Sequence, residues 1–76
     1  LIKDLSVYDN MYYYYRLHFG KEKSDKEIDK LISKQLRSLG IIDIKNSPVF
    51  KKGKYTISGG QRKRLNIALE LLKDVD

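Results

Sequence analysis

The residues best placed to carry chemistry form one short stretch, Ser58-Gly59-Gly60-Gln61, directly before a long run with helical apolar periodicity. A serine in front of a helix is a good cap, and the first amides of any helix lack intrahelical acceptors. These amides carry partial positive charge, and two glycines let an anion come close to the backbone because they have no Cβ atoms. Gln61 adds a side-chain amide in the first turn. The stretch therefore predicts a phosphate site that suits a nucleotide.

The residues around this stretch make it more specific than a Ser-Gly-Gly triplet, which in most proteins only caps a helix and lets the chain turn. Ile57 precedes it, and Arg62-Lys63-Arg64 follow it and lead into the apolar run from Leu65 to Leu72. The string resembles the signature motif of the ATP-binding cassette (ABC) ATPases, with Ile57 at the position where that family usually has Leu. Its basic residues and apolar run look most like the white-type and drug-resistance exporter branch.

Composition excludes several other kinds of site. The chain has 76 residues with no Cys and one His, so it has no disulfide framework and no Cys/His metal cluster, and we predict no metal site. No apolar run approaches the roughly 20 residues that cross a bilayer. The net charge of +6 favours anionic partners, and the basic residues concentrate at 51–54 and 62–64, beside the predicted phosphate site. Because the sequence starts in mid-pattern without Met, we expect a piece of a longer protein.

Helices are predicted to position the site. The first begins after Ser6, with Asp9 in a capping-box-like position, and apolar residues cover most of its circumference. One stripe holds Val7, Met11, Tyr14, Tyr15 and His18, and a second holds Tyr8, Tyr12 and Phe19. We therefore expect this helix to make contacts on two sides. The segment from Asp4 to Asn10 also resembles the ABC segment that follows the glutamine loop, so the resemblance covers nearly the whole chain.

The second helix is predicted to start at the capping box of residues 24–27 and to stop at Gly40. Its apolar face holds Ile28, Leu31, Ile32, Gln35, Leu36 and Leu39. Residues 41–44 are expected to form one further turn, and residues 46–57 a basic loop. The last helix should run from Gly60 to Lys73 and pack on the second helix. Its predicted apolar stripe consists of Leu65, Ala68, Leu69 and Leu72, with Ile67 and Leu71 beside them.

The resemblance implies an architecture as well as a motif. A complete ABC ATPase has a Walker A loop, a glutamine loop, a Walker B strand and a switch histidine, and the sequence contains none of these. His18 precedes the signature, whereas the histidine of the family follows it. What matches is the helical subdomain between the glutamine loop and Walker B. The resemblance therefore implies an all-α fold for residues 1–76, a bundle of three main helices without a sheet.

The same resemblance implies how the parent protein works. Residues 58–61 would act on a nucleotide held by a second ABC cassette. ATP with Mg²⁺ would be the cofactors of the intact dimer, with none bound by this chain alone. The chain would carry no catalytic residue, and the parent would be an ATPase coupled to transport at the cytoplasmic face of the cell membrane. Tyr8, Tyr12 and Phe19 are candidate contacts with the transmembrane domain of the transporter.

Two other classes of function fit parts of the sequence. A small basic nucleic-acid-binding module would use the positive charge, and the tyrosines for stacking. However, the gap from Gly40 to Ser58 is far longer than the turn of about three or four residues in a helix-turn-helix. No Gly-x-x-Gly clamp or RNA-recognition pattern occurs either, so we expect no nucleic acid partner. A purely structural helical interaction module is the third alternative.

Overall fold

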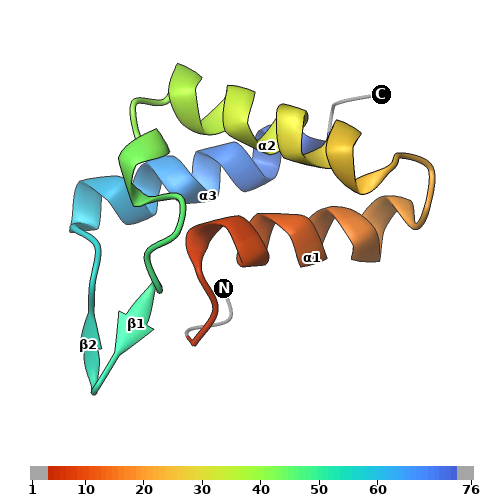
Figure 1. The fold of residues 1–76 in the computed structure, drawn as a ribbon. Helices are drawn as coiled ribbons and strands as arrows, with labels where there is room; N and C mark the ends of the chain where they lie inside the picture. Colours follow the sequence, from red (N-terminus) through yellow and green to blue (C-terminus); the bar gives the residue numbers. More distant parts are fainter. Residues whose placement is uncertain (1–3, 74–76) are drawn as a thin grey trace.

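The computed structural model describes residues 4–73, which form three α-helices, one 3-10 turn and a two-stranded hairpin (Figure 1). In chain order the elements are α1 (Val7–Phe19), α2 (Asp25–Ser38), η1 (Ile42–Ile44), β1 (Phe50–Lys51), β2 (Lys54–Tyr55) and α3 (Gly59–Lys73). The predicted architecture of three main helices is confirmed, and both ends of the predicted 1–76 unit lie outside the described residues. The expectation of no sheet is wrong, because part of the predicted basic loop pairs as β1 and β2.

Side-chain caps start the first two helices as the sequence predicts. The N–H of Asp9 donates to Ser6 Oγ at 3.0 Å. At α2 the box is reciprocal: the N–H of Glu27 donates to Ser24 Oγ at 3.2 Å, and the N–H of Ser24 donates to Glu27 Oε1 at 3.0 Å. Gly40 follows α2 with a φ of 71°, a left-handed conformation that other residues rarely adopt. Local signals therefore fix where both helices begin and where the second one stops.

One core joins the three helices. α3 packs on α1 as well as on α2, which is the partner that the sequence predicts, and α1 and α2 also touch (Figure 1). The buried apolar side chains are Val7, Met11 and Tyr15 of α1, Ile28, Ile32 and Leu36 of α2, Leu65, Ala68 and Leu72 of α3, and Ile41, Ile44, Val49 and Ile57 of the connecting segments. The stripe that α3 buries is narrower than predicted, because Ile67 and Leu71 stay 42% and 41% exposed.

Backbone hydrogen bonds tie residues 45–49, which we call the anchoring segment, to the start of α1. These bonds join Val7 N to Ser47 O (2.9 Å), Tyr8 N to Lys45 O (2.9 Å) and Val49 N to Leu5 O (3.2 Å). Ser6 and Pro48 form an isolated antiparallel bridge in the same region. The part of the chain that leads to α3 therefore starts from a fixed position beside α1.

The hairpin extends from the anchoring segment (Figure 1). Its turn consists of Lys52 and Gly53, which have φ angles of 51° and 78°. Positive φ at both positions is typical of the type I′ turn, which matches the twist of a two-stranded hairpin. The antiparallel register pairs Phe50 with Tyr55 and Lys51 with Lys54. The N–H of Thr56 then donates to Val49 O at 3.1 Å, which returns the chain to the anchoring segment just before the buried Ile57.

Leu65 and Ile67 allow a test of this packing within one helix. Leu65 is fully buried and Ile67 lies on the outer face. Leu65→Ala should lower the free energy of unfolding by about 2–5 kcal/mol, because it leaves a cavity in the core. Ile67→Ala, the matched control, should change it by no more than about 0.5 kcal/mol. Urea unfolding followed by circular dichroism measures both values, and equal losses would show that α3 buries a different face.

Lys45 joins α1 to α2 from the anchoring segment. Its Nζ lies 3.2 Å from Asp29 Oδ1 and donates to Oγ of the buried Ser33 at 3.1 Å. The same nitrogen sits 5.0 Å from the centre of the Tyr8 ring. Burial of the Tyr8 hydroxyl, and after it the charge of Asp29, raise the pKa of Tyr8 to about 12.

This raised pKa predicts a loss of stability in alkali. Because the pKa of Tyr8 in the folded chain lies above its ordinary value of 10.0, the unfolded chain releases the phenolic proton first as the pH rises. The contribution of the protonated Tyr8 to the free energy of unfolding is fully present below pH 10 and is lost as the pH approaches 12. Tyr8→Phe should therefore make the free energy of unfolding less sensitive to pH across this range. Urea unfolding at several pH values tests this, and identical pH curves for the variant and the wild type would refute it.

Candidate functional site

A second reciprocal capping box forms the start of α3. The N–H of Gln61 donates to Ser58 Oγ at 3.0 Å, and the N–H of Ser58 donates to Gln61 Oε1 at 2.8 Å. Ser58 is thus the predicted cap, and the helix begins at Gly59, one residue earlier than predicted. The box uses only acceptor atoms of the two side chains. The hydroxyl proton of Ser58 and the NH₂ group of Gln61 are therefore left to donate to a ligand.

The two glycines are not required by the fold of this chain. Gly59 and Gly60 are exposed, and neither has the left-handed conformation that favours glycine. A Cβ atom on Gly59 would lie 3.6 Å from Arg62 Nη2, and one on Gly60 would lie 3.9 Å from Ser58 Oγ, both ordinary contact distances. Alanine would fit at either position and would favour a helix by up to about 1 kcal/mol. The fold of the described residues therefore gives no reason for glycine at either position.

Basic residues without an ion pair precede and follow this helix start in the sequence. No Asp or Glu lies between Asp43 and Glu70. Besides Lys45, the basic residues of this stretch are Lys51, Lys52, Lys54, Arg62, Lys63 and Arg64. Those six account for the whole net charge of +6, since the other basic residues equal the acidic ones in number. The ion pairs found within residues 4–73 all use other side chains. An anion at the helix start would offset the repulsion among these cations.

Arg62 is held against the hairpin. Its guanidinium carbon lies over the face of Tyr55, 3.8 Å from the ring centre, and Tyr55 meets Phe50 edge-on at 5.1 Å between centroids. The Nε atom of Arg62 is buried and has no hydrogen-bond partner among the described residues. Sequence patterns did not single out Tyr55, because this contact depends on the hairpin, which brings residue 55 beside the first turn of α3.

The candidate membrane-domain contacts on α1 are half-buried against the core of this chain: Tyr8, Tyr12 and Phe19. The hydroxyl of Tyr12 also donates to Asp25 Oδ1 at 2.7 Å, which links α1 to the start of α2. The more exposed apolar side chains of α1 are those of Tyr13, at 50%, and Leu17, at 84%. The three candidates therefore have structural roles within the chain, and their contact with a membrane domain stays a prediction.

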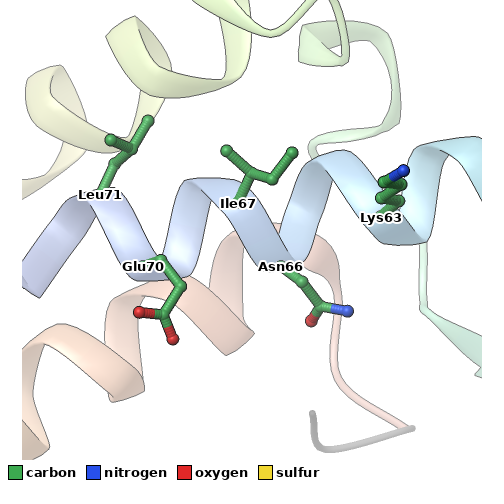
Figure 2. Close-up of a pocket in the computed structure, with 5 residues that line it drawn as sticks. All are labelled: Lys63, Asn66, Ile67, Glu70 and Leu71. Carbon is green, nitrogen blue, oxygen red and sulfur yellow. The ribbon is translucent and has the colours of Figure 1, made fainter.

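The outer face of α3 carries an open hollow of about 330 Å³ (Figure 2). Its lining consists of Lys63, Asn66, Ile67, Glu70 and Leu71. Figure 2 shows the side chains of Ile67 and Leu71 on one side of the helix and those of Asn66 and Glu70 on the other. Most of the surface that lines the hollow is apolar, and the lining does not pair a nucleophile with a base.

Other kinds of site can be checked within the same part of the chain. Residues 4–73 hold no group of three His, Cys, Asp or Glu side chains arranged to bind a metal ion. Nor is any helix among them long and apolar enough to cross a membrane. His18 is exposed near the end of α1, with Nδ1 3.0 Å from Tyr14 O.

Comparison of the sequence with known proteins places the chain in a family. The ABC transporter family model matches residues 1–76. The ABC-type transporter claG of Penicillium crustosum is 39% identical over 71 residues, which are 93% of this chain and 10% of that protein. ABC transporter G family member 25 of Oryza sativa subsp. japonica is 38% identical over 73 residues, 93% of this chain and 7% of that protein. The phosphate import ATP-binding protein PstB of Ehrlichia ruminantium (strain Gardel) is 40% identical over 63 residues, 83% of this chain and 24% of that protein.

The chain thus spans between 7% and 24% of the length of these three relatives. No solved structure shows a significant match to it. The G family relative agrees with the predicted resemblance to the white-type branch. Because the family model covers the full length of the sequence, the chain belongs to the ABC transporter family.

Proposed function

We propose that this chain is the helical subdomain of an ABC cassette, and that residues 58–61 contact the terminal phosphate of an ATP molecule held by a second cassette. The observation that carries the proposal is the pair of exposed glycines at a capped helix start, where the fold of the chain would accept alanine. A phosphate oxygen that approaches the backbone amides supplies the missing reason for glycine.

The donors at this helix start suit a phosphate. Ser58 has a hydroxyl proton and Gln61 an NH₂ group that the capping box does not use. The first amides of α3 add N–H donors and the positive end of the helix dipole. Residues 4–73 hold no group of three His, Cys, Asp or Glu side chains that could bind the Mg²⁺ of the nucleotide. The chain therefore contributes one side of a composite site, and a second cassette contributes the other.

The parent protein is then an ATPase coupled to transport, with ATP and Mg²⁺ as cofactors of the cassette dimer. This assignment is supported by the names of the relatives, which include ABC transporters and a phosphate import ATP-binding protein. It implies a location at the cytoplasmic face of the membrane. It also implies that α1 contacts the transmembrane domain through the part of Tyr8, Tyr12 and Phe19 that this chain leaves uncovered.

The nucleic-acid-binding alternative has less support. The positive charge is local, as a polyanion would require, but the segment between α2 and α3 contains η1 and a hairpin, not the short turn of a helix-turn-helix. Tyr55, an aromatic residue next to Lys54 in the sequence, already stacks on Arg62.

The isolated chain of 76 residues should neither hydrolyse ATP nor bind it tightly, because it provides only one side of the site. Isothermal titration with MgATP measures binding, and a phosphate-release assay measures hydrolysis. A titration with an oligonucleotide of the same charge as MgATP is the comparison for the nucleic-acid alternative. Turnover by a preparation free of contaminating ATPases would overturn the proposal, and salt-resistant oligonucleotide binding would favour the alternative.

Gly60→Asp in the intact parent should prevent the second cassette from docking. It should not change the nucleotide site of its own chain. The added bulk and negative charge would face the terminal phosphate, and like charges brought together at an interface cost several kcal/mol. We expect ATP-dependent dimer formation to weaken by at least about a hundredfold. Hydrolysis should fail with it, and the MgATP affinity of the monomer should stay within about twofold.

Gly60→Ala is the matched control for the fold. In the isolated chain it should unfold at the same or a slightly higher urea concentration than the wild type, because alanine fits and favours the helix. Loss of monomer affinity in Gly60→Asp with dimer formation intact would show that these residues bind the nucleotide of their own chain.

A further inference from the structure

Arg62 is in an unfavourable position for a residue that serves only its own fold. Its charge lies in the first turn of α3, where the helix dipole repels cations. It has no carboxylate partner among the ion pairs of residues 4–73. Its Nε is also buried without an acceptor. A surface arginine would normally turn into solvent and avoid all of these penalties.

Tyr55 is what keeps Arg62 in this position. The guanidinium carbon lies over the Tyr55 ring, 3.8 Å from its centroid, which is inside the range of a cation–π contact. Phe50 supports Tyr55 edge-on from the opposite strand of the hairpin. The anchoring segment, which directly precedes β1, is hydrogen-bonded to the start of α1. A series of contacts therefore connects the Arg62 guanidinium to the start of α1.

The guanidinium of Arg62 lies beside the glycine pair. Arg62 Nη2 lies 3.6 Å from the point where a Cβ on Gly59 would be. The neighbouring cations Lys63 and Arg64 are exposed and stack on no ring among the described residues. Among these three cations, Arg62 is the one held beside the glycine backbone. The proposed function assigns this backbone to phosphate binding.

We propose that Arg62 contacts the same phosphate as Ser58 and the glycine amides, and that Tyr55 is a positioning residue that holds its guanidinium ready. This inference rests on the proposed function, because it adds a charged ligand to that composite site. The guanidinium would donate charge-assisted hydrogen bonds to the phosphate oxygens and would gain the anionic partner that it lacks in this chain.

The test measures MgATP-dependent dimer formation by the intact parent protein at several salt concentrations. Arg62→Gln should weaken it by about ten- to a hundredfold, the usual size of a lost charge-assisted hydrogen bond, and should flatten its salt dependence. Arg64→Gln removes the same charge from an exposed side chain and should weaken dimer formation by no more than about threefold. Urea unfolding of each variant in the isolated chain confirms that the fold is kept.

Tyr55 is tested through Arg62. Tyr55→Leu should weaken dimer formation by about two- to fivefold, since it removes the aromatic face that holds the guanidinium. Tyr55→Phe keeps the aromatic face, so its dimer formation should equal that of the wild type. The double variant Tyr55→Leu with Arg62→Gln should be no weaker than Arg62→Gln alone, because Tyr55 acts only through Arg62.

The outcomes separate this inference from the proposed function. If Gly60→Asp blocks dimer formation while Arg62→Gln behaves like Arg64→Gln, the composite site stands and the role of Arg62 is wrong. If Tyr55→Leu adds fully to Arg62→Gln, or Tyr55→Phe is as weak as Tyr55→Leu, the positioning role of Tyr55 is wrong. If Gly60→Asp has no effect on dimer formation, the proposed function itself fails.

Discussion

The backbone hydrogen bonds between the first turn of α1 and the anchoring segment set the position of everything that follows in the chain. They use main-chain groups, so they constrain the path of the backbone whatever side chains lie beside it. The hairpin, the buried Ile57 and the cap of α3 come directly after them in sequence. The start of α3 is therefore held by α1 through a short and stiff connection, and the donors at that start have a defined place relative to the core.

The starts of α2 and α3 show how differently the same cap can be used. Both have a reciprocal box between a serine and the residue three positions on. α2 adds Asp25 and Glu27 in its first turn, which suit the helix dipole, and the bonds to Ser24 hold the pKa of Glu27 below its usual range. α3 has no acidic residue in its first turn and begins with two glycines and a run of cations.

The departures from the rules of local stability thus gather in one place. The glycines weaken the helix, the cations oppose its dipole, and Lys51 faces Lys54 across the hairpin, where like charges repel. Locally unfavourable residues that cluster in this way are expected at a binding site for an external anion.

The sequence predicted the parts of the structure that depend on neighbouring residues. The caps at Ser6, Ser24 and Ser58 and the stop at Gly40 all follow from short-range chemistry, and they are found where predicted. The hairpin was not predicted, because each of its strands has only two residues. Its turn is Lys52-Gly53, and the first position of such a turn is usually Asn or Asp, not Lys.

What escaped prediction depends on distant parts of the chain. The contact of Arg62 with Tyr55 exists only once the hairpin has formed, so no spacing in the sequence could reveal it. The burial of Leu65 and the exposure of Ile67 follow from where α1 and α2 both press on α3. Periodicity gives the width of an apolar stripe, but the neighbours of a helix decide how much of it is covered.

A mixed dimer tests the central claim most directly, because it asks whether the helix start of α3 serves its own chain or a partner. One parent chain carries Gly60→Asp, and the other is intact at residues 58–61 but disabled in the motifs that hold ATP. The account predicts that neither chain alone forms ATP-dependent dimers, whereas the mixture forms dimers that trap one ATP between the intact halves. A mixture as inactive as each chain alone, with both variants folded, would contradict the account.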